Sequence, residues 1–530
     1  MEQKYLSFLY PSRAAEERGR ESGGVNITND VAEELGLTSI LPLRNSSLSG
    51  FFTTDPEVIA YRQRMFGDLT RLPELAEALC DILPLLFDIT ELRRLESDYD
   101  PSGESYLYSV TEVELYVSCV NRLYEGLSSL GDRLESDAFR AFYEAIRTLA
   151  DSEYYKKLNE DLEALSSRIR EVKSITIGVN LTDTMRPTEA GVISVNSAPF
   201  KSGRMLDKIL RFSFKNDAMT TIAPLMPFDK GQNENRRDAL ITAFHGALDD
   251  VFRSSVRAWR SIVGEYVLEN TDFLLRILPE IEFITRAADL CRRLSERGYP
   301  LTLPELAPID EKAFSACGLY NPDVALRIED RVVENDFAFD DNGRVFILSG
   351  PNRGGKSVIT CALGLAQAMC QLGLPVPAKK ARISPVCAIF THFPTGAEDT
   401  LDKGRLGEEC ARLREIFDAA DADSLILLDE SLSSTGSYEA SFIAAEILTA
   451  FAALRARVLF STHLHELGDH VEEINRRSTA AGGVLVDTLV AGIEEGRRSF
   501  RIHRRKPDGK SYARDIADRY GLSFEKLKKP

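Results

Sequence analysis

The chain has 530 residues, of which 44% are hydrophobic and 28% are charged, and this length predicts about three or four domains instead of a single core. Its formal net charge of −17 opposes tight, non-specific binding of nucleic acid, which requires neutralised phosphates. The eight cysteines form no C-x-x-C pair, so neither a zinc site nor a disulfide framework is expected.

Residues 1–40 are polar and include a Gly/Ser-containing stretch from Glu21 to Val25, which predicts a loosely held N-terminal arm or a short cap. The first residues, Met1–Leu6, lack the apolar stretch of a signal peptide. No apolar run approaches the roughly 18 residues that a membrane span needs. We therefore expect a cytoplasmic protein with no membrane partner.

Helical spacing begins at Asp55 and predicts a helical core domain over residues 41–153. The apolar residues that recur at three- and four-residue intervals are Val58, Tyr61, Met65, Phe66 and Leu69. Further helical stretches are expected at Leu85–Leu95, Val110–Leu127 and Phe139–Leu149. These helices should bury one another as a bundle.

Residues 154–300 are predicted to form long lever helices that carry a small β-containing clamp at about 174–232. A charged helical stretch runs from Tyr154 to Ile175, and amphipathic spacing resumes at Glu234 for roughly fifty residues. The clamp is expected from two β-like runs, Ser174–Leu181 and Gly191–Val195. Four cations near its tip form either a solvated face or a DNA contact; they are Lys201, Arg204, Lys208 and Arg211.

Three prolines, Pro300, Pro304 and Pro308, predict a linker that returns to the core over residues 301–330. Residues 331–530 then have the pattern of an α/β domain with short apolar strands. The expected strands are Val345–Leu348, Ser424–Leu428 and Val458–Phe460. A basic tail follows from Ala491, and it is a solvated face, a dimer-contact strip or a nucleic-acid patch. Its cations are Arg497, Arg498, Arg501, Arg504, Arg505 and Lys506.

An intact G-x-x-x-x-G-K-S phosphate loop runs from Gly350 to Ser357. It lies between an apolar strand and the helical run Val358–Leu372, so a helix N-terminus would point at the bound anion. Glycine lets the backbone N–H groups turn inward, Lys356 would reach the β- and γ-phosphates, and the Ser357 hydroxyl would hold Mg²⁺. The residues expected to bind ATP are Gly350, Pro351, Asn352, Arg353, Gly354, Gly355, Lys356 and Ser357.

Two further apolar strands end in polar side chains that suit phosphoryl transfer. Asp429 follows one strand and can hold Mg²⁺ through water, while Glu430 can orient or deprotonate the attacking water. His463 follows the other strand and can sense the γ-phosphate, with a purely structural role as the alternative. Phosphate loop, Asp-Glu and His follow one another as in ABC-type ATPases, so ATP and Mg²⁺ are the expected cofactors.

At these motifs the chain resembles the MutS family of DNA mismatch-repair ATPases. The phosphate loop is similar to that family's G-P-N-x-G-G-K-S, Glu334-Asn335-Asp336 to its upstream Asn-Asp pair, Ser461–Leu467 to its T-H-x-x-E-L, and Lys510-Ser511-Tyr512 to its late K-S-Y. The resemblance implies a helical core, lever helices with a clamp, and an ABC-type ATPase domain. It also implies a homodimer with composite nucleotide sites, and an adenine-stacking role for His503.

The chain also departs from the family's pattern. Where the family reads G-R-G-T-S-T after its second carboxylate, this chain reads Ser431-Leu432-Ser433-Ser434-Thr435-Gly436-Ser437, so the serine that would contact the partner's nucleotide stays open among Ser431, Ser433, Ser434 and Ser437. We expect no counterpart of the family's N-terminal mismatch-reading domain or of a C-terminal Smr nuclease domain.

We therefore expect a short member that clamps double-stranded or branched DNA in repair or recombination and does not read mismatches. A ribosome- or RNA-associated ATPase and a nucleotide-switched protein scaffold are the alternatives.

Overall fold

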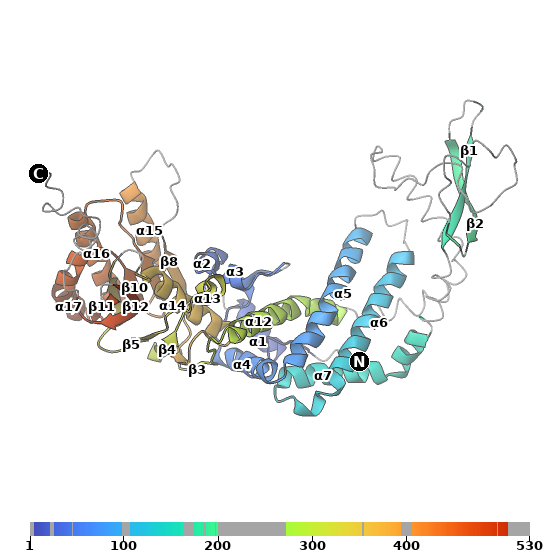
Figure 1. The fold of residues 1–530 in the computed structure, drawn as a ribbon, viewed down its shortest axis with the longest axis horizontal. Helices are drawn as coiled ribbons and strands as arrows, with labels where there is room; N and C mark the ends of the chain where they lie inside the picture. Colours follow the sequence, from blue (N-terminus) through green and yellow to red (C-terminus); the bar gives the residue numbers. More distant parts are fainter. Residues whose placement is uncertain are drawn as a thin grey trace, which may run out of the picture. The chain divides into compact units, whose positions relative to one another are not determined.

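The computed structural model describes residues 5–21, 26–44, 46–97, 106–160, 162, 173–181, 183, 187–196, 198–199, 272–351, 354–393, 405–494 and 497–506. These residues form helices and three sheets, which confirms the expected mixed architecture (Figure 1). The chain divides into two compact units. Unit 1 comprises Met1–Ala76, Arg133–Ala141 and Pro279–Pro530, and unit 2 comprises Glu77–Asp132 and Phe142–Leu278.

The described part of the N-terminal segment is packed into unit 1, which contradicts the loosely held arm expected for residues 1–40 and leaves the short cap as the alternative. The Phe8 side chain is 1% exposed. Glu280 accepts hydrogen bonds from the backbone N–H of Phe8 at 2.6 Å and from the Ser7 hydroxyl at 3.0 Å. Ile27, Val31 and Leu35 recur at four-residue spacing and are buried, and this signal was outweighed by the polar residues around them. The segment contains α1 (Arg13–Glu21), α2 (Asn29–Glu34) and α3 (Leu37–Ile40).

Helix α4 (Pro56–Arg71) begins where the sequence predicts. Asp55 is its N-cap and accepts the backbone N–H of Glu57 at 2.9 Å, and Pro56 occupies the first turn, where its missing N–H costs nothing. The five apolar residues expected on one face are all buried. Helix α12 (Leu278–Glu296) belongs to the same unit apart from its first residue.

Unit 2 contains most of α5 (Pro73–Ser97) and α7 (Asp137–Asp151), all of α6 (Tyr106–Ser128), and α11 (Asp272–Arg276). Helix α5 begins well before the expected Leu85 and continues through Pro84. An internal proline costs a helix about 3 kcal/mol, and burial of one apolar face offsets this cost. The fully buried residues of that face are Leu79, Ile82, Leu86 and Ile89.

The two β-like runs form an antiparallel hairpin of β1 (Ser174–Leu181) and β2 (Pro187–Asn196), in which Ser174 pairs with Asn196. The lever helices expected after Tyr154 and from Glu234 lie largely outside the described residues, as do the four basic residues near the tip. The domain boundaries of this region therefore stay predictions.

The α/β part of unit 1 is built on a six-stranded sheet of order β12-β11-β6-β10-β9-β8, in which only β12 is antiparallel. The three strands expected from the sequence are present as β6, β9 and β10. The strand bounds are β6 Val345–Ser349, β8 Ile389–His392, β9 Leu425–Asp429, β10 Arg457–Ser461, β11 Val486–Glu494 and β12 Arg497–Arg504.

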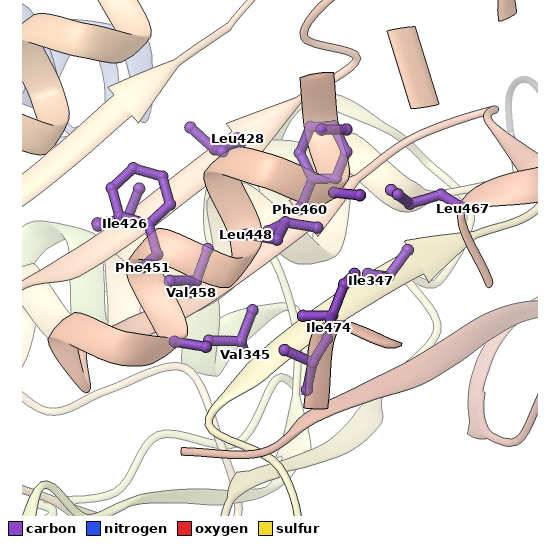
Figure 2. Packing of buried hydrophobic residues seen from close by; sticks show 14 of the residues in the cluster. Val345, Ile347, Ile426, Leu428, Leu448, Phe451, Val458, Phe460, Leu467 and Ile474 are labelled. Atoms are coloured by element: carbon purple, nitrogen blue, oxygen red, sulfur yellow. The ribbon is translucent and has the colours of Figure 1, made fainter. Parts of the chain in front are cut away.

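Helices cover both faces of this sheet. On one face, α16 (Ser437–Leu454) and α17 (Val471–Ala480) pack on alternate strand residues, and Figure 2 shows Phe451 and Leu448 of α16 against the strand side chains. On the other face lies α14 (Lys356–Gln371), where a Cβ on Gly364 would stand 2.7 Å from Leu427 Cδ1. Helix α15 (Arg405–Ala419) joins the first face.

Helix α16 is, among the described residues, the one helix long and apolar enough to cross a membrane by length and composition. We expected no such segment from the sequence. Its Ala444, Leu448 and Phe451 are fully buried in the core, where Figure 2 shows Leu448 and Phe451, and core helices meet the same criterion.

Residues 301–330, expected to be a linker, contribute instead to a four-stranded sheet of order β3-β7-β4-β5. Its strands are β3 Glu305–Leu306, β4 Phe314–Leu319, β5 Asn335–Phe339 and β7 Lys380–Ile383, with α13 (Pro322–Arg327) after β4. Pro304 directly precedes β3, and Pro308 caps a short 3₁₀ turn. The prolines thus delimit short elements, because they cannot donate to a strand ladder.

Candidate functional site

Four neighbouring parallel strands of the large sheet end at one edge. The phosphate loop and several polar residues lie at these strand ends. Gly350 follows β6, Glu430 follows β9, and Thr462 and His463 follow β10, while His392 ends β8. The pairing of Ser461 with both Leu348 and Asp429 puts the three central strand ends level. Ligands of open α/β sheets bind outside such carboxyl ends.

The phosphate loop needs its glycines for space and for backbone conformation. Gly350 has a φ of 147°, and a Cβ there would lie 2.7 Å from that of Ala491. A Cβ on Gly354 would lie 2.7 Å from the Pro351 carbonyl oxygen. Gly355 has a φ of 91° and is the N-cap of α14. Two members of the predicted site, Asn352 and Arg353, lie outside the described residues.

Lys356 is the first residue of α14 and is only 4% exposed. Its ammonium donates hydrogen bonds to the carbonyl oxygens of Gly350 at 3.0 Å and Pro351 at 3.2 Å. Burial lowers the pKa of Lys356, and the charges of Glu430 and Asp429 act in the opposite direction. The amine therefore stands inside the loop, at a helix N-terminus that favours anions.

The two carboxylates at the end of β9, Asp429 as its last residue and Glu430 just after it, lie close to this amine but in different surroundings. The Glu430 carboxylate is partly exposed, with one oxygen 3.8 Å from Lys356 Nζ. Asp429 is 6% exposed and accepts a hydrogen bond from the Ser461 hydroxyl. Ser357, in the first turn of α14, is exposed. The structure thus brings the phosphate-loop lysine and the Asp-Glu pair together as the sequence predicts.

The four candidate serines in the segment after Glu430 differ in their exposure. Ser431 is 2% exposed, and its hydroxyl shares a 2.7 Å hydrogen bond with His392 Nδ1. Ser433, Ser434 and Ser437 are exposed. Ser431 is therefore engaged within its own chain, whereas the other three remain candidates for contact with a second molecule.

Two histidines predicted for the site are exposed. His463 follows β10 at the edge where the other strand-end residues gather. His503 lies on β12 and pairs with Val490 of β11. Val490 in turn pairs with Ser349, the last residue before the phosphate loop. His503 also lines a cavity of about 810 Å³ together with Val332, Asn335, Lys379, Arg501 and Ile502.

Phe500 is a residue of the site that the sequence reasoning missed. It is 44% exposed, and its Cδ1 lies 3.3 Å from where a Cβ on Gly355 would stand. Its φ of 55° is rare for a bulky residue. The side chain of Asn335 holds this conformation, because it donates to the Phe500 carbonyl at 3.1 Å and accepts the Ile502 N–H at 2.8 Å. The signal in the sequence that could have pointed to Phe500 is an aromatic residue within a run of basic residues.

The basic tail is partly neutralised within the chain. Arg504 pairs with Asp340 and with Asp487, whose oxygen is 2.5 Å away, and Lys506 pairs with Glu472 at 3.0 Å. These contacts favour a structural role for Arg504 over a nucleic-acid contact.

Comparison with known proteins places family matches on both units. The family model for MutS domain V matches residues 346–489, and the model for the MutS2 N-terminal domain matches residues 54–297. The chain is 31% identical over 281 residues to "Endonuclease MutS2" of Thermus thermophilus, which covers 49% of this chain and 36% of that protein.

It is 34% identical over 281 residues to "DNA mismatch repair protein MutS" of Brevibacillus brevis, covering 50% of this chain and 31% of that protein. A Listeria monocytogenes protein with the same description is 29% identical over 271 residues, covering 49% of this chain and 29% of its own length. The matched part of the chain thus spans about a third of the length of these relatives.

Proposed function

Because this chain belongs to the MutS family, we propose that it is an ATPase that binds DNA and acts in repair or recombination. Two of its relatives are described as a mismatch repair protein and an endonuclease. The observation that carries the proposal is the convergence of Lys356, Asp429 and Glu430 at the carboxyl edge of one parallel sheet. We assign the α/β part to the ABC type of phosphate-loop ATPase.

The residues of the edge fit a magnesium-bound nucleoside triphosphate. A Cβ at Gly350 or Gly354 would collide with Ala491 or with the Pro351 carbonyl oxygen, so glycine is needed for this path of the loop, and the Lys356 ammonium already donates to backbone oxygens inside the loop. Ser357 and Asp429 would hold Mg²⁺, which neutralises phosphate charge when bound. These donors are of the hard oxygen type that magnesium prefers.

Each side chain then has one role in hydrolysis. Lys356 binds phosphate oxygens through charge-assisted hydrogen bonds. Glu430 orients the attacking water and accepts its proton, which its partly exposed carboxylate allows. His463 donates a hydrogen bond to the terminal phosphate. Phosphoryl transfer depends mostly on positioning and charge neutralisation, and these groups supply both.

A second copy of the chain completes the site in this proposal. Ser433 and Ser434 are exposed just before α16, and Ser437 is exposed as its first residue. On the same helix, Tyr438 and Phe442 are 80% and 61% exposed. These two aromatic residues are four positions apart, so they share one helix face. Exposed aromatic side chains beside an open polar loop are typical of protein interfaces, which supports a homodimer with composite nucleotide sites.

The DNA part of the proposal is tested with a binding panel. Duplex, four-way junction and single-stranded DNA are titrated with and without ATP, at low and at raised salt. We expect duplex or junction binding that weakens with salt and changes with ATP. Failure of every DNA to bind at low salt contradicts the proposal, and co-sedimentation with ribosomes instead would favour an RNA cargo.

A further inference from the structure

The turn after β9 carries two strained residues beside the proposed catalytic centre. Glu430 and Leu432 have φ values of 48° and 64°, in the left-handed region that residues other than glycine rarely adopt. Such conformations persist only where the surrounding structure holds them. The direction of the Glu430 carboxylate therefore depends on whatever fixes this turn.

Two of the attachments are easily recognised. From β10, the Ser461 carbonyl oxygen accepts the backbone N–H of Glu430 at 2.8 Å. From the core, Leu432 is 1% exposed and packs with the apolar residues of α16 and the strands. Between them lies Ser431, whose backbone is flanked by the two strained residues.

The third attachment comes from β8, on the opposite side of β9. His392 ends β8, is 6% exposed, and shares its 2.7 Å hydrogen bond with the Ser431 hydroxyl. Burial and the charge of Arg412 lower the pKa of His392 to about 4, so the ring is neutral near pH 7. The Arg412 guanidinium donates hydrogen bonds to the Glu34 carboxylate at 2.8 Å and to the Thr391 carbonyl oxygen at 3.3 Å, which fix its position.

We propose that His392 is a positioning residue for ATP hydrolysis: its hydrogen bond to Ser431 fixes the Glu430–Leu432 turn and so holds the Glu430 carboxylate beside Lys356. The turn is thereby gripped from both neighbouring strands, by Ser461 on one side and by His392 on the other. The consequence for hydrolysis rests on the proposed function, whereas the effect on the turn does not.

The test compares variants that remove this hydrogen bond with a matched control. His392→Ala, Ser431→Ala and the double variant each break it, and His392→Asn keeps a polar nitrogen near the position of Nδ1. Ser424→Ala is the control, because Ser424 is also 1% exposed and hydrogen-bonded, through Asp421, but lies at the opposite end of β9.

We expect kcat for ATP to fall on the order of 10- to 100-fold in His392→Ala and Ser431→Ala, as small displacements of a catalytic group can do. The Kd for ATP should change less than about twofold, since Lys356 and the loop are untouched. The double variant should be no worse than Ser431→Ala, because Ser431→Ala already removes both contacts of this hydroxyl with His392, the one to Nδ1 and the 3.4 Å hydrogen bond to the backbone carbonyl oxygen. His392→Asn should recover much of the rate.

Hydrogen exchange gives a second measurement that needs no turnover. In both single variants, amides of residues 430–436 should exchange faster, while those of residues 356–360 should be unchanged. If the wild-type protein hydrolyses no ATP, the proposed function is overturned. Hydrogen exchange alone then tests whether the hydrogen bond between His392 and Ser431 fixes the turn. Unchanged exchange and unchanged kcat in folded His392→Ala overturn the inference, and so does an equal loss of kcat in Ser424→Ala.

Discussion

The ammonium of Lys356 lies 3.8 Å from a carboxylate oxygen of Glu430, although the two residues follow β6 and β9, which are separated in the sheet by β10. The contact therefore crosses one strand. It depends on the inward turn of the phosphate loop at one end and on the strained turn after β9 at the other. Under the proposed function, phosphate binding and water activation would therefore depend on separate pieces of backbone, and variants should separate them.

The first prediction concerns the phosphate loop. Gly350→Ala should destabilise the loop by about 1–3 kcal/mol and weaken ATP binding, because its φ is 147° and the new Cβ would meet Ala491 at 2.7 Å. Gly67→Ala in α4 is the control, since nothing lies within 4 Å of its Cβ position. It should leave ATP binding unchanged and stabilise the helix slightly. Isothermal titration calorimetry measures the ATP affinity of both variants. Wild-type affinity in Gly350→Ala would refute the packing argument.

The second prediction compares Phe500 with His503 as the residue that contacts the base. Phe500→Ala should weaken ATP binding by about 1 kcal/mol while leaving inorganic triphosphate binding unchanged, because an aromatic ring beside Gly355 stacks on a base and not on phosphates. His503→Ala is measured in parallel. A selective loss in His503→Ala alone would support the family-based assignment of that residue.

The third prediction concerns the stability of unit 1 outside the site. Asp68 is 1% exposed and accepts the backbone N–H groups of Glu135 at 3.1 Å and Ser136 at 2.8 Å, and it also pairs with Arg71. Asp68→Ala should lower the free energy of unfolding by about 3 kcal/mol, because the buried N–H of Ser136, the partly buried N–H of Glu135 and the Arg71 guanidinium all lose their acceptor.

Glu135→Ala is the control for Asp68. The Glu135 side chain is 74% exposed, so removing its ion pair with Arg71 should change the free energy of unfolding by less than about 0.5 kcal/mol. Urea denaturation of both variants makes the comparison. Equal effects would show that the buried carboxylate has no special role.

The fourth prediction is a pH dependence that follows from His392. Burial and the Arg412 charge lower its pKa from 6.5 to about 4 in the folded state, so the unfolded chain binds more protons between these values. The stability contributed by neutral His392 is present above pH 6.5 and is lost as the pH falls through 4. The loss should amount to about 3 kcal/mol.

This contribution is isolated by comparing wild type with His392→Asn at several pH values. The difference in free energy of unfolding between the two proteins should shrink as the pH falls from 7 to 4.5. A difference that stays constant over this range would mean that His392 keeps an ordinary pKa.

The parts of the site that sequence predicted are those defined by neighbours along the chain. The phosphate loop, Asp429-Glu430 and Thr462-His463 each follow an apolar strand directly, so strand pattern and motif locate them together. Continuously apolar runs predicted the central strands in the same way, and every residue of β6, β9 and β10 is buried in the structure.

The parts that sequence missed depend on contacts between distant residues. His392 and Ser431 are 39 positions apart, and Asn335 and Phe500 are 165 apart, so no local pattern joins them. The four-stranded sheet was missed because β3 and β7 are short and come from distant segments. The first half of α5 was missed because Pro84 argues against a helix there. Burial of the apolar face of α5 outweighs the free-energy cost of this proline.

The most direct test of the account measures ATP binding and ATP hydrolysis separately in Lys356→Ala and Glu430→Gln. Lys356→Ala should lose nucleotide binding, because the buried ammonium inside the loop is gone. Glu430→Gln should bind ATP as wild type does but turn it over at least about 100-fold more slowly, since the amide cannot accept a proton. Equal hydrolysis by wild type and Glu430→Gln, or full ATP binding by Lys356→Ala, would contradict the assignment of this sheet edge as an ATPase centre.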